Sequence, residues 1–198
     1  RTVAAGPIVR RISPLGMLAL SSVLAIAGLL ALSQTAGASM LAIFAAATLY
    51  GIGKSFFWPT MLGVAAEQCP KGGALTLNTL GGIGMLAVGI LGAPFIGYLQ
   101  ESTATKELAA ANQAVYAKVT IEKSYLLGDY RAIDPVKAEQ VTDADGKAAL
   151  AKAGEAGQFG ALARIAMFPG LMLVTYLGMM PSYKSRAGDK PVALDAAH

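Results

Sequence analysis

Residues 14–33 read PLGMLALSSVLAIAGLLALS, an uninterrupted stretch without a charged side chain. A helix that crosses the hydrocarbon core of a bilayer, about 30 Å thick, needs about 20 predominantly apolar residues at about 1.5 Å each. Charged residues are also nearly absent from 34–66, 72–100 and 165–183. The sequence therefore predicts an all-α integral membrane protein with four membrane-spanning helices, over about 14–33, 40–66, 74–99 and 162–181.

The composition fits a chain that lies mainly in lipid. Of the 198 residues, 55% are hydrophobic and 14% are charged, whereas about a quarter of the residues of a soluble domain are charged. The net charge is +4, but the basic residues flank apolar stretches and do not gather with exposed aromatics, so we expect no nucleic-acid partner. Because Cys69 is the only cysteine and His198 the only histidine, we expect no disulfide, metal or cofactor.

The segment 101–160, called the insertion below, interrupts the apolar pattern. It holds seven Lys or Arg and nine Asp or Glu, and it is rich in Ala and Lys. We predict a soluble, mostly helical insertion before the last span, with Asp134-Pro135 as the N-cap and first residue of one helix and Asp143 or Asp145 capping another. The chain then divides into a cytoplasmic loop with three spans, the insertion, and the last span with a polar cytoplasmic tail, over 1–100, 101–160 and 161–198.

The short loops indicate how the chain crosses the membrane. Lys and Arg in short loops favour the cytoplasmic side, whereas long loops are translocated largely regardless of charge. The turn between the first two spans, SQTAGAS at 33–39, is uncharged. We therefore predict that both ends of the segment and the turn at Lys71 are cytoplasmic and that the insertion is outside. The membrane is predicted to be a cell membrane, in particular a bacterial inner membrane. The basic residues that indicate this orientation are Arg1, Arg10, Arg11, Lys71, Lys184, Arg186 and Lys190.

The order of glycines, prolines and charges along the spans resembles major facilitator transporters. Residues 49–70, LYGIGKSFFWPTMLGVAAEQCP, resemble the tenth helix of that family, with a glycine pair, a mid-helix proline and a terminal acidic residue before a proline. GPIVRR at 6–11 resembles the loop between helices eight and nine, and GILGAPFIGY at 89–98 resembles helix eleven. The resemblance covers the four spans, about two thirds of the chain, and implies helices nine to twelve of a twelve-helix fold, with the missing N-terminal helices as partners.

Two departures and one alternative accompany this resemblance. Arg10 stands where the family loop usually has an acidic residue, and the insertion is longer than the usual loop before the last helix. The spans could also correspond to helices three to six, because the two halves of the family are repeats. The polar tail after Tyr183 and the absence of an early arginine in the second span favour the C-terminal assignment, and Arg1 in place of a starting Met suggests a fragment.

Lys54 is the foremost candidate for a site residue, because it lies deep in the second span. An ionisable residue at that depth is costly and usually marks a solute or ion pathway, although its aliphatic stem can also extend to the headgroups. Tyr50, Phe56, Phe57 and Trp58 surround it in sequence and could stack on a ligand or pack against other helices. We take Tyr50 and Trp58 as candidate cavity residues beside Lys54.

Three further positions are candidates at the ends of the spans. Asn78, near the cytoplasmic end of the third span, can line a pathway or join helices by hydrogen bonds. The resemblance implies that Glu67 forms a cytoplasmic gating contact with Arg10 or Arg11. Arg164 lies at the outer end of the fourth span, where it can contact headgroups or take part in an outer gate.

These features predict a permease rather than an enzyme. The residues at membrane depth include no pair of nucleophile and base and no pair of carboxylates. The resemblance implies a secondary transporter that moves a small polar solute by alternating access, with ion coupling as an option. The alternative is a four-helix membrane scaffold whose extracytoplasmic insertion binds a partner.

Overall fold

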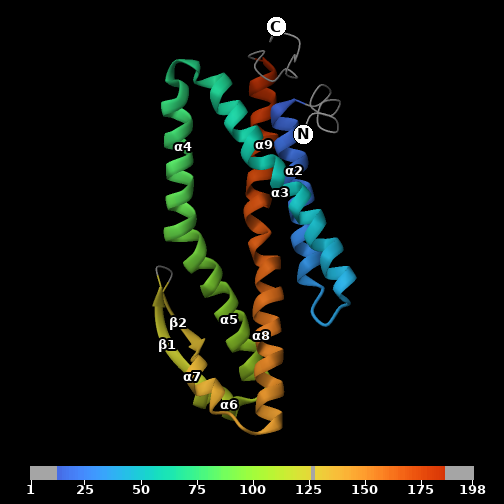
Figure 1. Ribbon diagram of the computed structural model, residues 1–198, viewed down its shortest axis with the longest axis vertical. Coiled ribbons are helices and arrows are strands. Elements are labelled where there is room, and N and C mark those ends of the chain that lie inside the picture. Colours follow the sequence, from blue (N-terminus) through green and yellow to red (C-terminus); the bar gives the residue numbers. More distant parts are fainter. Residues whose placement is uncertain (1–12, 126–127, 186–198) are drawn as a thin grey trace. The chain divides into compact units, whose positions relative to one another are not determined.

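The computed structural model describes residues 13–125 and 128–185, and these residues form helices and one β-hairpin (Figure 1). Two compact units can be separated. The first unit contains the residues up to Leu29, Phe44–Gly82 and the residues from Ala166 on, and the second contains Leu30–Ile43 and Ile83–Ile165.

The described residues include four helices that are long and apolar enough to cross a membrane, so the chain is membrane-embedded and its membrane part is helical. The first, α2 (Pro14–Ser33), coincides with the predicted first span. Ser13 caps it, because the Ser13 hydroxyl accepts a hydrogen bond from the Gly16 N–H at 3.1 Å. The second, α3 (Met40–Gln68), extends the predicted second span by two residues and contains Pro59.

The third and fourth apolar helices continue beyond the predicted spans. α4 (Gly73–Ala87) is followed by η2, a π-helical turn over Val88–Gly92, and then by α5 (Ala93–Ala111). Pro94 explains the π turn, because proline has no N–H to donate and its ring disturbs the preceding helical turn. A helix therefore runs well past the predicted end at residue 99.

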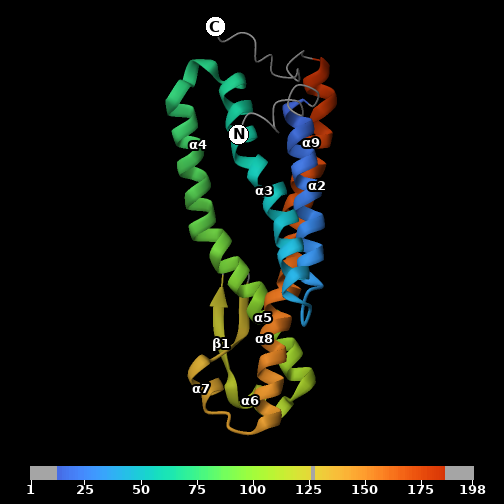
Figure 2. The ribbon, with the colours of Figure 1, turned by 45° about the vertical axis from the view of Figure 1, so that its right-hand side comes forward.

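The last apolar helix has a comparable interruption. α8 (Ala144–Ile165) ends one residue before Ala166, and α9 (Met167–Ser185) follows at once. Pro169 has no N–H to donate to the carbonyl four residues earlier, that of Ile165, and this explains why the helix is interrupted at this point. Within the first unit, α2 lies beside α9 in both ribbon views (Figures 1 and 2).

The second unit contains a small folded body outside the apolar spans. α5 and α8 pack side by side, and between them the chain forms α6 (Gln113–Val119), strands β1 (Thr120–Tyr125) and β2 (Gly128–Ile133), and α7 (Pro135–Glu139) (Figure 2). The strands pair antiparallel. The core of this body consists of Leu108, Val115, Val119, Val141 and Ala153.

The insertion is therefore more than the helical segment that the sequence predicts. Its helices are present, but the antiparallel hairpin β1–β2 was not predicted from the Ala- and Lys-rich composition. Both predicted caps are confirmed: the Asp134 carboxylate accepts the Val136 N–H at 3.0 Å, and the Asp143 carboxylate accepts the Gly146 N–H at 2.7 Å. Asp143, and not Asp145, is the capping residue of α8.

Candidate functional site

Lys54 lies midway along α3, and Tyr50 lies one turn before it. Lys54 is about 21 Å along the helix axis from both Met40 and Gln68, at about 1.5 Å per residue. Its Nζ is 6.0 Å from the centre of the Tyr50 ring, a distance at which a ring face attracts a cation. Among the described side chains, Lys54 has no carboxylate partner, and it is exposed within this chain.

The α3 segment that carries these residues is held against α2 by glycines. A Cβ atom added at Gly28 of α2 would lie 2.5 Å from the Tyr50 backbone nitrogen. A Cβ atom added at Gly53 of α3 would lie 2.7 Å from the Ala25 backbone nitrogen. Such close approach of two backbones is typical of helix packing in lipid, where small residues take the place of interlocking side chains.

Lys54 and Trp58 lie to one side of this contact. Successive residues of an α-helix are rotated by about 100°, so Lys54 is well around the helix from Gly53. Tyr50, Lys54 and Trp58 are spaced by four residues and therefore follow one another along one stripe of α3. Trp58 is 46% exposed, and its ring lies 3.8 Å from the position of a Cβ atom added at Gly81 of α4. The structure thus brings the three α3 candidates together.

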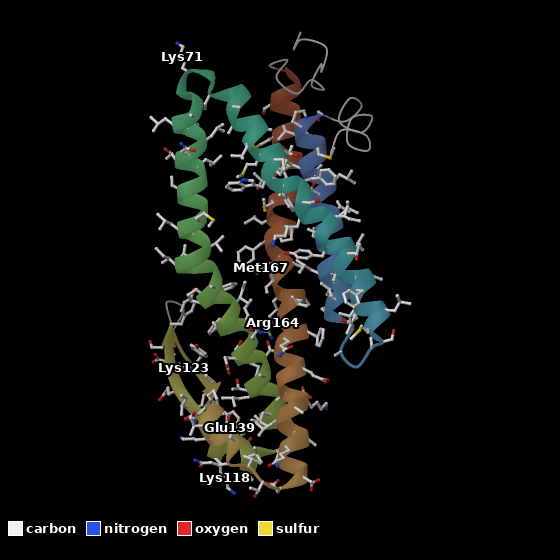
Figure 3. The ribbon with its side chains drawn as sticks, in the orientation of Figure 1. Lys71, Lys118, Lys123, Glu139, Arg164 and Met167 are labelled. Carbon is white, nitrogen blue, oxygen red and sulfur yellow. The ribbon has the colours of Figure 1, made fainter. Side chains whose placement is uncertain are left out.

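The remaining candidates are not joined to this stripe. Asn78 lies in α4 with an exposed side chain. Glu67 lies in the last turn of α3, but its side chain, like Arg10 and Arg11, falls outside the described residues, so the predicted gating contact stays a prediction. Arg164 is exposed near the end of α8, before Met167 opens α9 (Figure 3).

The second unit contains an aromatic cluster that the sequence does not predict. The Tyr98 ring of α5 stacks on Tyr125 of β1 at 5.8 Å between centroids and meets Tyr130 of β2 edge-on at 5.1 Å. The Tyr125 hydroxyl donates to the Leu91 carbonyl in η2 at 3.2 Å. A partial signal was present: half of the residues of 120–125 are β-branched or aromatic, as is typical of strands, but only Tyr130 and Ile133 are so in 128–133.

The side chains of the α3 stripe can bind a solute. No group of three or more His, Cys, Asp or Glu that could hold a metal ion occurs within 13–125 and 128–185. The stripe offers instead a cation, a phenol and an indole, which together can contact an anionic, hydroxylated or aromatic solute. Comparisons of the chain with protein-family models, curated proteins and solved structures found no match.

Proposed function

We propose that the chain is the C-terminal part of a secondary transporter of the major facilitator type. In this proposal the protein moves a small polar solute across a cell membrane by alternating access, and ion movement can be coupled to the cycle. The proposal rests on one observation above the others: an exposed lysine stands midway along an apolar helix. A charge held at that depth is costly, and membrane proteins usually retain such charges for a pathway.

The arrangement around Lys54 supports the proposal. The contacts at Gly28 and Gly53 fix one side of α3 against α2. Lys54 is left exposed within the described residues, and Trp58 beside it is 46% exposed, so both can face a solute or another helix. Four spans are too few to enclose a pathway of this type, so the proposal requires the missing N-terminal helices, from which a carboxylate or an anionic solute would face Lys54.

The predicted topology belongs to the same proposal. Both ends of the segment and the Lys71 turn lie in the cytoplasm, and the insertion lies outside. Glu67 with Arg10 or Arg11 then forms an inner gate. An exposed ion pair contributes about 0–1 kcal/mol, enough to shift the balance between two conformations but too little to hold the fold.

Solute uptake by the full-length product tests the proposal. Vesicles containing it would be screened with sugars, organic anions and nucleosides, with and without a proton gradient. We expect uptake of at least one class and loss of that uptake in Lys54→Ala. Lys71→Ala is the matched control, because Lys71 lies in the η1 turn Pro70–Gly72 and not within a span.

The outcomes separate the proposal from its alternative. Equal uptake by Lys54→Ala and Lys71→Ala would show that Lys54 is not a site residue. A correctly inserted full-length protein that transports none of the solutes would instead favour the membrane scaffold. One observation makes the scaffold a real competitor: the insertion has a hydrophobic core of its own, which includes the fully buried Leu108 and Val119.

A further inference from the structure

Tyr125, at the end of strand β1, is hydrogen-bonded to the third apolar helix at a position that can be compared with the thickness of a bilayer. Leu91, whose carbonyl accepts the Tyr125 hydroxyl, lies about 27 Å from Gly73 along the helix, at about 1.5 Å per residue. The hydrocarbon core is about 30 Å thick. A helix that enters the core near Gly73, just after Lys71, therefore leaves it close to Leu91, and the hairpin end lies at that boundary.

The surface around this point is apolar on the helix and amphipathic on the hairpin. Val88 and Ile90 of η2 are each 66% exposed. Tyr98, Tyr125 and Tyr130 form the aromatic cluster on α5 and the hairpin, and the Tyr125 hydroxyl reaches the same turn at the Leu91 carbonyl. Tyrosine is enriched where hydrocarbon meets headgroups, because its ring is apolar and its hydroxyl is polar.

A charged side chain of the hairpin fits the same boundary. Lys123 is exposed on β1 two residues before Tyr125 (Figure 3). The long stem of a lysine lets its ammonium group extend to headgroup phosphates from an apolar boundary. The opposite end of the hairpin, at Thr120 and Ile133, continues instead into α6 and α7.

We propose that the end of the β1–β2 hairpin is a membrane anchor that inserts among lipid headgroups. Its ligand is the boundary between the headgroups and the acyl chains of the bilayer. The anchor consists of Tyr125, with Lys123 beside it and Tyr98 and Tyr130 behind it. It ties the insertion to the membrane surface at the end of the third span. It needs only that the apolar helices lie in a bilayer, so it stands or falls independently of transport.

Depth-dependent fluorescence quenching tests the anchor. Trp58 is the only tryptophan, so Trp58→Phe provides a background without tryptophan. Tyr125→Trp in this background reports on the hairpin end in phosphatidylcholine vesicles, with and without lipid brominated at carbons 6 and 7 of the acyl chain. Val136→Trp is the matched control: Val136 is 65% exposed in α7, beyond β2, whose length places it about 17 Å or more from the hairpin end.

We expect blue-shifted emission from Tyr125→Trp and about twofold quenching by brominated lipid, because an interfacial indole lies close to the upper acyl carbons. Val136→Trp should show neither effect. Ser124→Trp, at an exposed neighbouring position, repeats the measurement without altering the aromatic cluster. If both hairpin variants are quenched no more than Val136→Trp, the proposal is wrong. Blue-shifted emission without quenching would also overturn it, by showing that protein covers the hairpin end.

Discussion

The insertion and the α2–α3 pair are held together by different forces. In the insertion, Leu108, Val119 and Ala153 are fully buried, so the hydrophobic effect can stabilise the fold in water. Along α4, by contrast, no residue is buried within the described chain. Apolar side chains gain little by leaving lipid, so close contact between helices matters more for the spans than burial does. The insertion has a hydrophobic core of its own, whereas α4 has none within the described residues.

Glycine has a related role in both regions. A Cβ atom added at Gly157 of α8 would lie 2.9 Å from the Gln100 carbonyl oxygen and 2.9 Å from the Ala104 Cβ. α5 and α8 therefore approach each other as closely as α2 and α3 do at Gly28. In the insertion this contact adds to a core of larger side chains. In the α2–α3 pair the close approach occurs twice, at Gly28 and at Gly53.

Leu108→Ala should have the largest effect and should be confined to the insertion. Removing a buried leucine side chain costs about 2–5 kcal/mol of unfolding free energy. Hydrogen exchange of the reconstituted protein should therefore accelerate throughout the insertion, while the spans stay protected. Leu150→Ala, at a partly buried position against the same core, is the control and should cost less. Equal effects of the two substitutions would contradict the assigned core.

Gly28→Leu should damage the α2–α3 pair and leave the insertion intact. The new side chain would collide with the Tyr50 backbone, and overpacking of this kind costs about 1–3 kcal/mol. The measurement is SDS-induced unfolding followed by Trp58 fluorescence. Gly51→Leu is the control, because a Cβ atom at Gly51 meets nothing within 4 Å. An unchanged midpoint in Gly28→Leu would show that the contact does not hold the pair together.

Asp143→Ala should weaken the start of α8 by about 1 kcal/mol, the usual cost of losing an N-cap. The Gly146 amide, which donates to the Asp143 carboxylate, should exchange faster. Asp145→Ala removes a carboxylate from the same helical turn but leaves the cap in place, so its effect should be smaller. Faster exchange at Gly146 in Asp145→Ala than in Asp143→Ala would reverse the assignment.

Lys152→Ala should have the smallest effect. Its Nζ lies 3.0 Å from the Glu107 carboxylate, joining α8 to α5, but the lysine side chain is 70% exposed. Exposed ion pairs contribute about 0–1 kcal/mol and are screened by salt. The thermal midpoint of the insertion should barely change, at low or at high salt. A large, salt-dependent loss would mean that charge, and not the core, stabilises this region.

The spans could be predicted from sequence because lipid imposes a simple length and composition. Residues 14–33 match α2 from end to end for this reason. The helices that carry the third and fourth spans extend beyond the predicted bounds at 99 and 162, because Ala, Lys and Glu continue a helix into water as readily as they form a separate domain. The hairpin is not predicted, because strand-forming residues make up half or less of 120–125 and 128–133 and the neighbouring segments are rich in Ala.

The candidate site was predictable in part. The spacing of Tyr50, Lys54 and Trp58 along α3 follows from helical geometry, and the structure places them on one stripe. The close contact between Gly28 and Tyr50 depends on which helices pair with each other. Small residues allow two helices to approach closely, but they do not determine the partner. Likewise, the bond from Tyr125 to Leu91 joins residues 34 apart and arises only once the hairpin has formed.

The depth of Lys54 also has an electrical consequence. An energised membrane changes the energy of a unit charge by about 2.3 kcal/mol per 100 mV over its full thickness. The electrical energy of a cation midway along α3 therefore changes by about half of that amount, whichever way the helix crosses the membrane. If the surrounding helices rock and Lys54 shifts along the field, voltage alone will change the balance between the two conformations. In the proposed transporter, the lysine would then act as a gating charge as well as a binding group.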